Sequence, residues 1–172
     1  MELKRVIEAV LFSSARPITS REFTKKLHDF SPEEVMHALF ELIHEYNTSD
    51  RSVSIVEVSG GYQMRTRTDC KEWVKRFVKE REAGLTKSML ETLSIIAYKQ
   101  PVSKKEIDHV RGVDSARAIK HLLEKRLIEL GGRNEDIGKA MVFRTTKMFL
   151  EVYGLMNLTD LPTFREMESL EK

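Results

Sequence analysis

Histidines and a single cysteine are the side chains of this sequence that could do metal or nucleophilic chemistry. The best cluster is His37, Glu41 and His44, whose spacing places all three on one face of a helix, as the ligands of a zinc site would lie. The apolar residues of that helix occupy its opposite face, so we expect a solvated or partner-contacting stripe rather than a metal site. Cys70 has no histidine at a matching spacing, and we expect a structural thiol.

The glycine pairs of the sequence offer no phosphate-binding loop. Gly60-Gly61 and Gly131-Gly132 stand beside β-type stretches and lack the G-x-G-x-x-G or G-K-[ST] pattern. Both pairs are typical of hairpin turns. The sequence therefore predicts a protein that is not an enzyme and that has no cofactor and no small-molecule substrate.

Composition and charge exclude further classes. The chain has 172 residues, of which 41% are hydrophobic and 33% charged, as in a globular protein of one or two domains. No apolar run approaches the roughly 18 residues of a membrane span, and the first residues lack a signal-peptide pattern, so we expect a cytoplasmic protein without membrane contact. The net charge of +2 gives no overall attraction to nucleic acid, although residues 84–160 carry 13 basic against 10 acidic side chains.

An internal repeat organises the chain. The segment VIEAVLFSSARPITSREF in the first half aligns without gaps with LETLSIIAYKQPVSKKEI in the second, sharing P-[IV]-[ST]-x-x-E-[FI]. Thr19 with Glu22, and Ser103 with Glu106, form a capping box that begins a helix, directly after a proline that ends the helix before it. Each copy predicts a helix, a tight turn and a second helix.

The elements that follow the repeat have the same order in both halves. In the first half we expect a third helix capped by Ser31, a hairpin around Gly60-Gly61, and a fourth helix with Trp73, Val74, Phe77 and Val78 on one face. In the second half we expect helices at 86–98, at 103–110 and from Asp114, strands at 127–130 and 141–145, and a closing helix from Thr146.

This order predicts a mainly α protein with small β-hairpins (α+β), built as tandem winged helix-turn-helix domains. We expect an N-terminal domain at 1–83, a C-terminal domain at 84–157, and a flexible acidic tail at 158–172.

The third helix of a winged helix usually enters the major groove of DNA. In the first domain this helix has four glutamates and no lysine or arginine, so DNA phosphates would repel it and a protein partner, including a second copy, is favoured. In the second domain Arg117 and Lys120 are possible DNA contacts, although acidic neighbours favour a solvated basic face or a protein interface. A DNA-binding transcriptional regulator is therefore the alternative function.

The second half also carries a long and specific pattern. It consists of LTKSMLETLSIIAYKQPVSKKEIDHVRGVDS, LLEKRLIELGGR and FRTTKMFLEVYGLMNLTDLP. Together with LKRVIEAVLFSSARPIT in the first half, it resembles the segregation and condensation protein B family over nearly the whole chain. One departure is Ile137 to Ala140, where family members usually have a Pro-Gly-Arg-Pro-like wing.

The resemblance implies a non-catalytic subunit of the bacterial SMC condensin-like complex, which takes part in chromosome condensation and segregation before cell division. It implies a homodimer formed through the first domain, which grips the kleisin, segregation and condensation protein A, and reaches the SMC ATPase through it. Contact with DNA would be indirect or weak. The protein would be cytoplasmic and associated with the nucleoid.

Two surfaces are candidates for the dimer contact, because excess apolar residues and an acidic-histidine stripe have no other role. One is the first helix, with Val6, Val10 and Leu11, and the other is the third-helix face that carries His37 and His44.

For the kleisin we expect polar or aromatic residues beside turns of the family-matching second domain, since these suit a peptide that orders on binding. They are Tyr98, Lys99, Gln100, Arg111 and Arg133. In the alternative, Tyr98 packs in the core and Arg111 caps the second helix.

Overall fold

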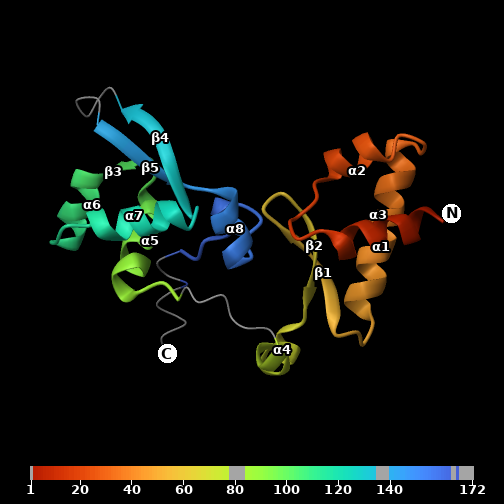
Figure 1. The fold of residues 1–172 in the computed structure, drawn as a ribbon. Coiled ribbons are helices and arrows are strands. Elements are labelled where there is room, and N and C mark those ends of the chain that lie inside the picture. The colour runs from red at the N-terminus through yellow and green to blue at the C-terminus, as the bar shows by residue number, and fades with distance from the viewer. Residues whose placement is uncertain (1, 78–83, 135–139, 164–165, 167–172) are drawn as a thin grey trace. The chain divides into compact units, whose positions relative to one another are not determined.

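The structure, a computed structural model, describes residues 2–77, 84–134, 140–163 and 166 (Figure 1). The chain divides into two compact units, residues 1–81 and 82–172. Each unit has three helices, a β-hairpin and a short closing helix, which confirms the predicted α+β fold with tandem winged helices.

The first unit begins with three helices and continues with an antiparallel hairpin and a short helix. The elements are α1 (Leu3–Ser13), α2 (Ser20–Lys26), α3 (Pro32–Thr48), β1 (Val53–Val58), β2 (Gly61–Thr66), a 3-10 turn at Thr68–Cys70, and α4 (Lys71–Phe77). Its core lies between α1, α2, α3 and the hairpin, and its most buried side chains include Ile7, Leu11, Phe23, Val35, Leu39 and Ile55.

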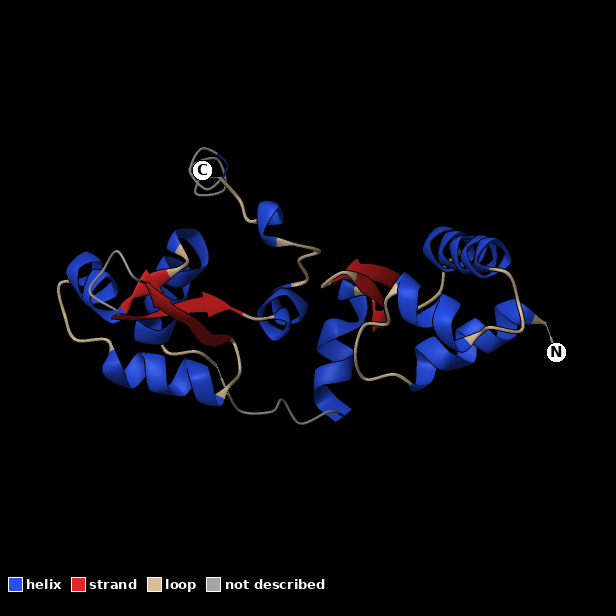
Figure 2. Ribbon diagram, turned by 90° about the horizontal axis from the view of Figure 1, so that it is seen from above, coloured by secondary structure: helices blue, strands red, loops and turns tan. Residues whose placement is uncertain are grey.

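The second unit has the same order with a longer hairpin, drawn in red in Figure 2. The elements are α5 (Lys87–Lys99), β3 (Val102–Ser103), α6 (Lys104–Arg111), α7 (Ala116–Glu124), β4 (Ile128–Asn134), β5 (Ala140–Thr145), α8 (Lys147–Tyr153) and a 3-10 turn at Leu158–Asp160. The three strands pair antiparallel in the order β3-β5-β4. Residues 137–139 of the divergent wing lie outside the described residues.

A third strand position, which the sequence did not predict, joins the hairpin in both units. In the second unit Val102 on β3 pairs with Phe143 on β5. In the first unit the aligned residue, Ile18, makes an isolated bridge with Tyr62 on β2. Gly61 permits this approach, because a Cβ at that position would lie 2.8 Å from the carbonyl of Ile18. The repeat therefore also includes the pairing, in each unit, between the residue just before the second helix and a strand of the hairpin.

The capping boxes predicted for the second helix of each unit are present. The Glu22 amide donates to Thr19 Oγ1 at 3.2 Å while the Thr19 amide donates to Glu22 Oε2 at 3.1 Å. Ser103 and Glu106 make the same reciprocal pair. In contrast, α7 begins at Ala116, and the side chain of its N-cap residue, Ser115, makes no capping hydrogen bond. Asp114, which was expected to cap this helix, lies one residue earlier and accepts a hydrogen bond from the Ala116 amide.

The segment from residue 158, expected to be a flexible tail, is anchored in its first part. Leu161 packs against the core of the second unit, as does Leu155 just before the segment. The hydroxyl of Tyr98 donates to the carbonyl of Pro162 at 2.7 Å. Because two leucines reach the core, the chain stays on the second unit as far as Pro162.

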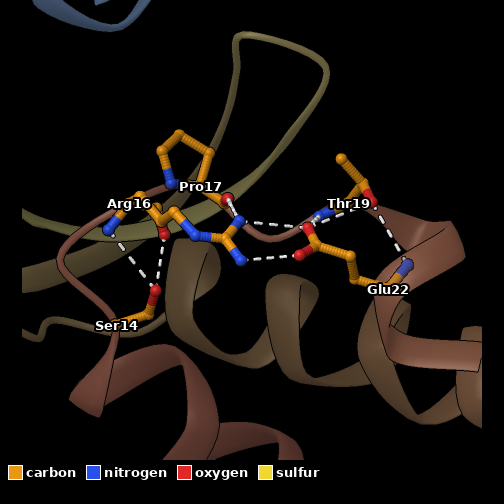
Figure 3. A network of polar contacts seen from close by, with 5 residues as sticks. All are labelled: Ser14, Arg16, Pro17, Thr19 and Glu22. Carbon is orange, nitrogen blue, oxygen red and sulfur yellow. Dashed lines mark hydrogen bonds and ion pairs between the residues drawn. The ribbon is translucent and has the colours of Figure 1, made fainter. Parts of the chain in front are cut away.

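An arginine clamps the capping box of the first unit (Figure 3). Arg16 donates from Nη2 to Glu22 Oε1 at 2.6 Å and from Nη1 to Glu22 Oε2 at 3.1 Å. These bonds, followed by the backbone bond from Thr19, lower the pKa of Glu22 to about 2. The aligned residue of the second unit is Gln100, so Glu106 has no such arginine, and its lowered pKa comes mainly from hydrogen bonds with Ser103.

Replacing Arg16 with Gln is expected to raise the pKa of Glu22 by about one pH unit or more, because the strongest bond to the carboxylate is lost. A carboxyl whose folded pKa is depressed stabilises the fold above its unfolded pKa, and this stabilisation is lost as pH falls from about 4.5 to 2. Between pH 4.5 and pH 2, the melting temperature should therefore fall by less in the variant than in the parent.

Carboxyl NMR titration measures the pKa directly, and Glu106 in the other unit is the internal control because it should not move. A Glu22 pKa that stays near 2 in the variant would contradict the assignment to Arg16.

Candidate interaction surfaces

The exposed face of α3 carries the predicted His37, Glu41 and His44 stripe. All three side chains face solvent, and His37 Nδ1 lies 3.7 Å from Glu41 Oε2. Among the described residues, no three His, Cys, Asp or Glu side chains are grouped as metal ligands. The stripe is therefore exposed to solvent in this chain, and its contact with a partner stays a prediction.

An aromatic side chain lies at the centre of this stripe and was missed by the sequence interpretation. Phe40 is 54% exposed and meets Tyr62 edge to face, with ring centroids 6.4 Å apart. Phe40 lies three residues after His37 and four before His44, so helical spacing puts it on the polar face of the helix. An aromatic residue on a polar face is a signal that the sequence alone contains. We call His37, Phe40, Glu41 and His44 the α3 stripe.

The first helix presents a different surface from the one predicted. Leu11 is only 1% exposed and packs in the core of its own unit, so the prediction that it contacts a second copy is wrong. The reason is the helical spacing of Ile7 and Leu11, which points both toward α3. Val6 and Val10 are half-buried, and the large apolar side chain that α1 exposes is Phe12, at 82%.

The closing helix α4 leaves its aromatic residues in solvent. Trp73 and Phe77 are both exposed, and the Arg76 guanidinium lies 4.3 Å above the Trp73 ring. Val78, predicted on the same face, lies outside the described residues. Cys70, at the start of this helix, is half-buried, and desolvation followed by the charge of Asp69 raises the pKa of its thiol, which disfavours a nucleophilic role.

Three of the five predicted kleisin residues gather at the end of α5. Lys99 and Tyr98 are exposed, and Tyr98 holds Pro162 as described above. Gln100 is bonded into the fold, because its Oε1 accepts from the amide of Thr145 at 2.7 Å and from its hydroxyl at 3.1 Å. Tyr98 and Lys99 are therefore the accessible members of this group.

The other two predicted kleisin residues do not join them. Arg111 has a side chain only 6% exposed, and its Nη2 donates to Ser88 Oγ at 3.0 Å and Glu91 Oε2 at 3.2 Å. Ser88 and Tyr98 are about 15 Å apart along α5, so Arg111 ties α6 to the opposite end of that helix and the predicted five-residue site is not one site. Arg133 lies on β4, and its side chain is outside the described part of the structure.

A groove of about 940 Å³ begins beside Gln100 and runs along the hairpin and α8. Leu130, Met148 and Leu158 line it with partly exposed apolar side chains. Cationic residues line it as well, namely Arg126, Arg144 and Lys147, of which Arg144 pairs with Glu129 at 2.8 Å. We call this hollow the second-unit groove.

The predicted DNA contacts of the second unit, Arg117 and Lys120, are both exposed on α7. Within the described ranges no helix is long and apolar enough to span a membrane.

Comparison with known proteins gives a consistent family. The family described as segregation and condensation complex subunit ScpB matches residues 5–164. The chain is 41% identical over 172 residues to segregation and condensation protein B of Syntrophotalea carbinolica, covering 100% of this chain and 87% of that protein.

Solved structures are similar as well. The crystal structure of ScpB from Mycobacterium tuberculosis aligns with 90% of this chain and 96% of its own at 32% identity and a TM-score of 0.42. A dimer of an ScpB N-terminal domain complexed with an ScpA peptide aligns with 44% of this chain and 93% of its own at 22% identity and a TM-score of 0.40.

Neighbouring residues of α1 give a direct test of its orientation. Leu11→Ala is expected to lower the free energy of unfolding by about 2–5 kcal/mol, because it leaves a cavity in the core. Phe12→Ala, one position away and exposed, should change it by less than about 0.5 kcal/mol. Denaturant unfolding of both variants makes the measurement, and similar losses would contradict the burial pattern of α1.

Proposed function

Because the chain belongs to the segregation and condensation complex subunit ScpB family, we propose that it is a non-catalytic subunit of an SMC–kleisin complex that acts in chromosome condensation and segregation. The observation that carries the proposal is the family match over residues 5–164, with 41% identity to a curated member over all 172 residues. In this role the SMC ATPase hydrolyses ATP, and this chain contributes two protein-binding modules. Its place is in the cytoplasm, on the nucleoid.

We place the homodimer contact on the α3 stripe. Its helix has four glutamates and no cation, so it suits a protein surface better than DNA. Phe40 supplies the half-exposed aromatic anchor that interface centres favour. A two-fold axis near Phe40 and Glu41 would set His37 opposite the partner subunit's His44, which is the self-complementary pattern that a symmetric dimer needs.

Aspartate substitutions on the two helices separate the candidate dimer faces. Phe40→Asp is expected to reduce the mass in solution from two protomers to one, because it places a charge at the centre of the contact. Phe12→Asp makes the same chemical change on α1 and should leave the dimer intact. Light scattering on the full chain reads both masses.

A Phe40→Asp variant that keeps the mass of two protomers would remove the α3 stripe from the interface. A Phe12→Asp variant that becomes a monomer would place the contact on α1.

The kleisin is proposed to bind the second unit at the second-unit groove, with Tyr98 and Lys99 at its edge. The groove adjoins Gln100, which follows both residues in the chain. Exposed leucine and methionine side chains give apolar anchor points, while the cationic lining favours a segment that combines apolar and acidic residues. Such a segment orders as it binds, so this contact suits a linker region of the partner.

A charge introduced into the groove should weaken kleisin binding. Leu130 is 50% exposed and lines the groove, whereas Val113 is 56% exposed in the turn between α6 and α7. Leu130→Glu is expected to weaken the affinity for the purified kleisin at least about tenfold, equal to about 1.4 kcal/mol. Val113→Glu is the matched control and should leave the affinity unchanged.

Isothermal titration of the full-length variants with the kleisin makes this comparison. Equal affinities for Leu130→Glu and the parent would exclude the groove as the kleisin site.

The alternative function, a transcriptional regulator with tandem winged helices, predicts tight and salt-steep duplex binding centred on Arg117 and Lys120 of the second unit. The acidic α3 opposes DNA contact in the first unit, because DNA phosphates would repel its glutamates. A subunit that binds other proteins is therefore the better fit.

A further inference from the structure

We propose that the second unit also binds the backbone of duplex DNA directly, through a cationic surface on α7 and the turn that follows it. We call this the α7 basic surface, and it consists of Arg117, Lys120, Lys125 and Arg126. The proposal goes beyond the assembly role, since that role needs only protein contacts.

The cations of the α7 basic surface are uncompensated. Elsewhere in this unit, Lys104 pairs with Asp108 and Asp114, and Arg144 pairs with Glu129. The four cations of the α7 basic surface form no ion pair within the described ranges. The acid on α7, Glu124, lies 3.1 Å from His121 Nδ1 instead. Cations that the fold does not pair are available to phosphates.

Two cations of the α7 basic surface line a hollow beside this helix. It has a volume of about 530 Å³ and is lined on one side by Arg117, His121 and Lys125, which follow one another at intervals of four residues on one helix face. Its other side is formed by Thr86, Ser88 and Met89 at the start of α5. The hollow thus offers a concave place where two cations face the same volume.

The composition of α7 favours nucleic acid over a protein partner. None of the large apolar side chains of α7 is exposed, whereas protein interfaces are anchored by such residues. In addition, α7 is the third helix of its winged-helix unit, the position that lies against DNA in this fold. The equivalent α3 has the opposite charge and an exposed phenylalanine, so the two third helices have diverged toward different partners.

Contact through phosphates alone predicts weak binding that does not depend on the DNA sequence and whose affinity falls steeply as the salt concentration rises. If Arg117, Lys120 and Lys125 each neutralise one phosphate, the logarithm of affinity should fall against the logarithm of salt with a slope of about −3.

Fluorescence anisotropy of the full chain with a mixed-sequence duplex of about three helical turns tests the proposal. Arg117→Glu with Lys120→Glu should weaken binding at least about tenfold. The matched control is Lys25→Glu with Lys26→Glu, two exposed cations of α2 that give the same change in net charge, and it should bind like the parent. Lys125→Ala should reduce the salt slope by about one.

Three results would overturn the proposal. They are a parent chain that shows no salt-dependent binding, an equal loss in both double variants, and a strong preference between two unrelated duplex sequences. Arg117→Gln with Lys120→Gln serves if the glutamate pair unfolds the unit. The glutamate pair should also keep its affinity for the kleisin, so failure of the DNA contact is distinguishable from failure of the assembly role.

Discussion

Both units depend on one local constraint, the reciprocal capping of their second helix. A hydroxyl residue and a glutamate three positions later satisfy each other's backbone amides, and the proline just before them ends the preceding helix. This fixes the turn between the first two helices, and it places Phe23 or Ile107, one residue after the glutamate, in the core of its unit. The same turn also carries the residue that pairs with the hairpin, so helices and wing are positioned together.

On this shared frame the two units have diverged at equivalent positions. Arg16 strengthens the cap of the first unit, while the aligned Gln100 bonds to a strand of the second. The third helices differ most, since α3 is acidic around an exposed phenylalanine and α7 is basic without an exposed apolar anchor. A repeat that keeps the core and exchanges the surface charge gives one chain two different surfaces, and a subunit that links other components needs such a difference.

The features that could be predicted from the sequence are those that depend on residues close together in the chain. The repeat, the capping boxes and the turn glycines each have a signature that acts over a few residues, so the tandem winged helices could be derived from it. Side-chain roles that depend on distant neighbours could not. The spacing of Ile7 and Leu11 puts them on one helix face, but that this face packs against α3 rather than against a second copy depends on tertiary contacts. The bonds that bury Arg111 against α5 likewise join residues far apart in the chain. Phe40 was the exception, since an apolar residue on a polar helix face is visible in the sequence.

This chain is proposed to act as a subunit of a chromosome-segregation complex rather than as a protein that acts alone. Affinity capture of the tagged protein from its own cytoplasm, at moderate salt with nuclease added, tests it most directly when the co-purifying chains are identified by mass spectrometry. We expect a kleisin and an SMC ATPase to be recovered together after the nucleic acid has been digested. Recovery of neither, together with tight and sequence-specific duplex binding by the purified chain, would contradict it.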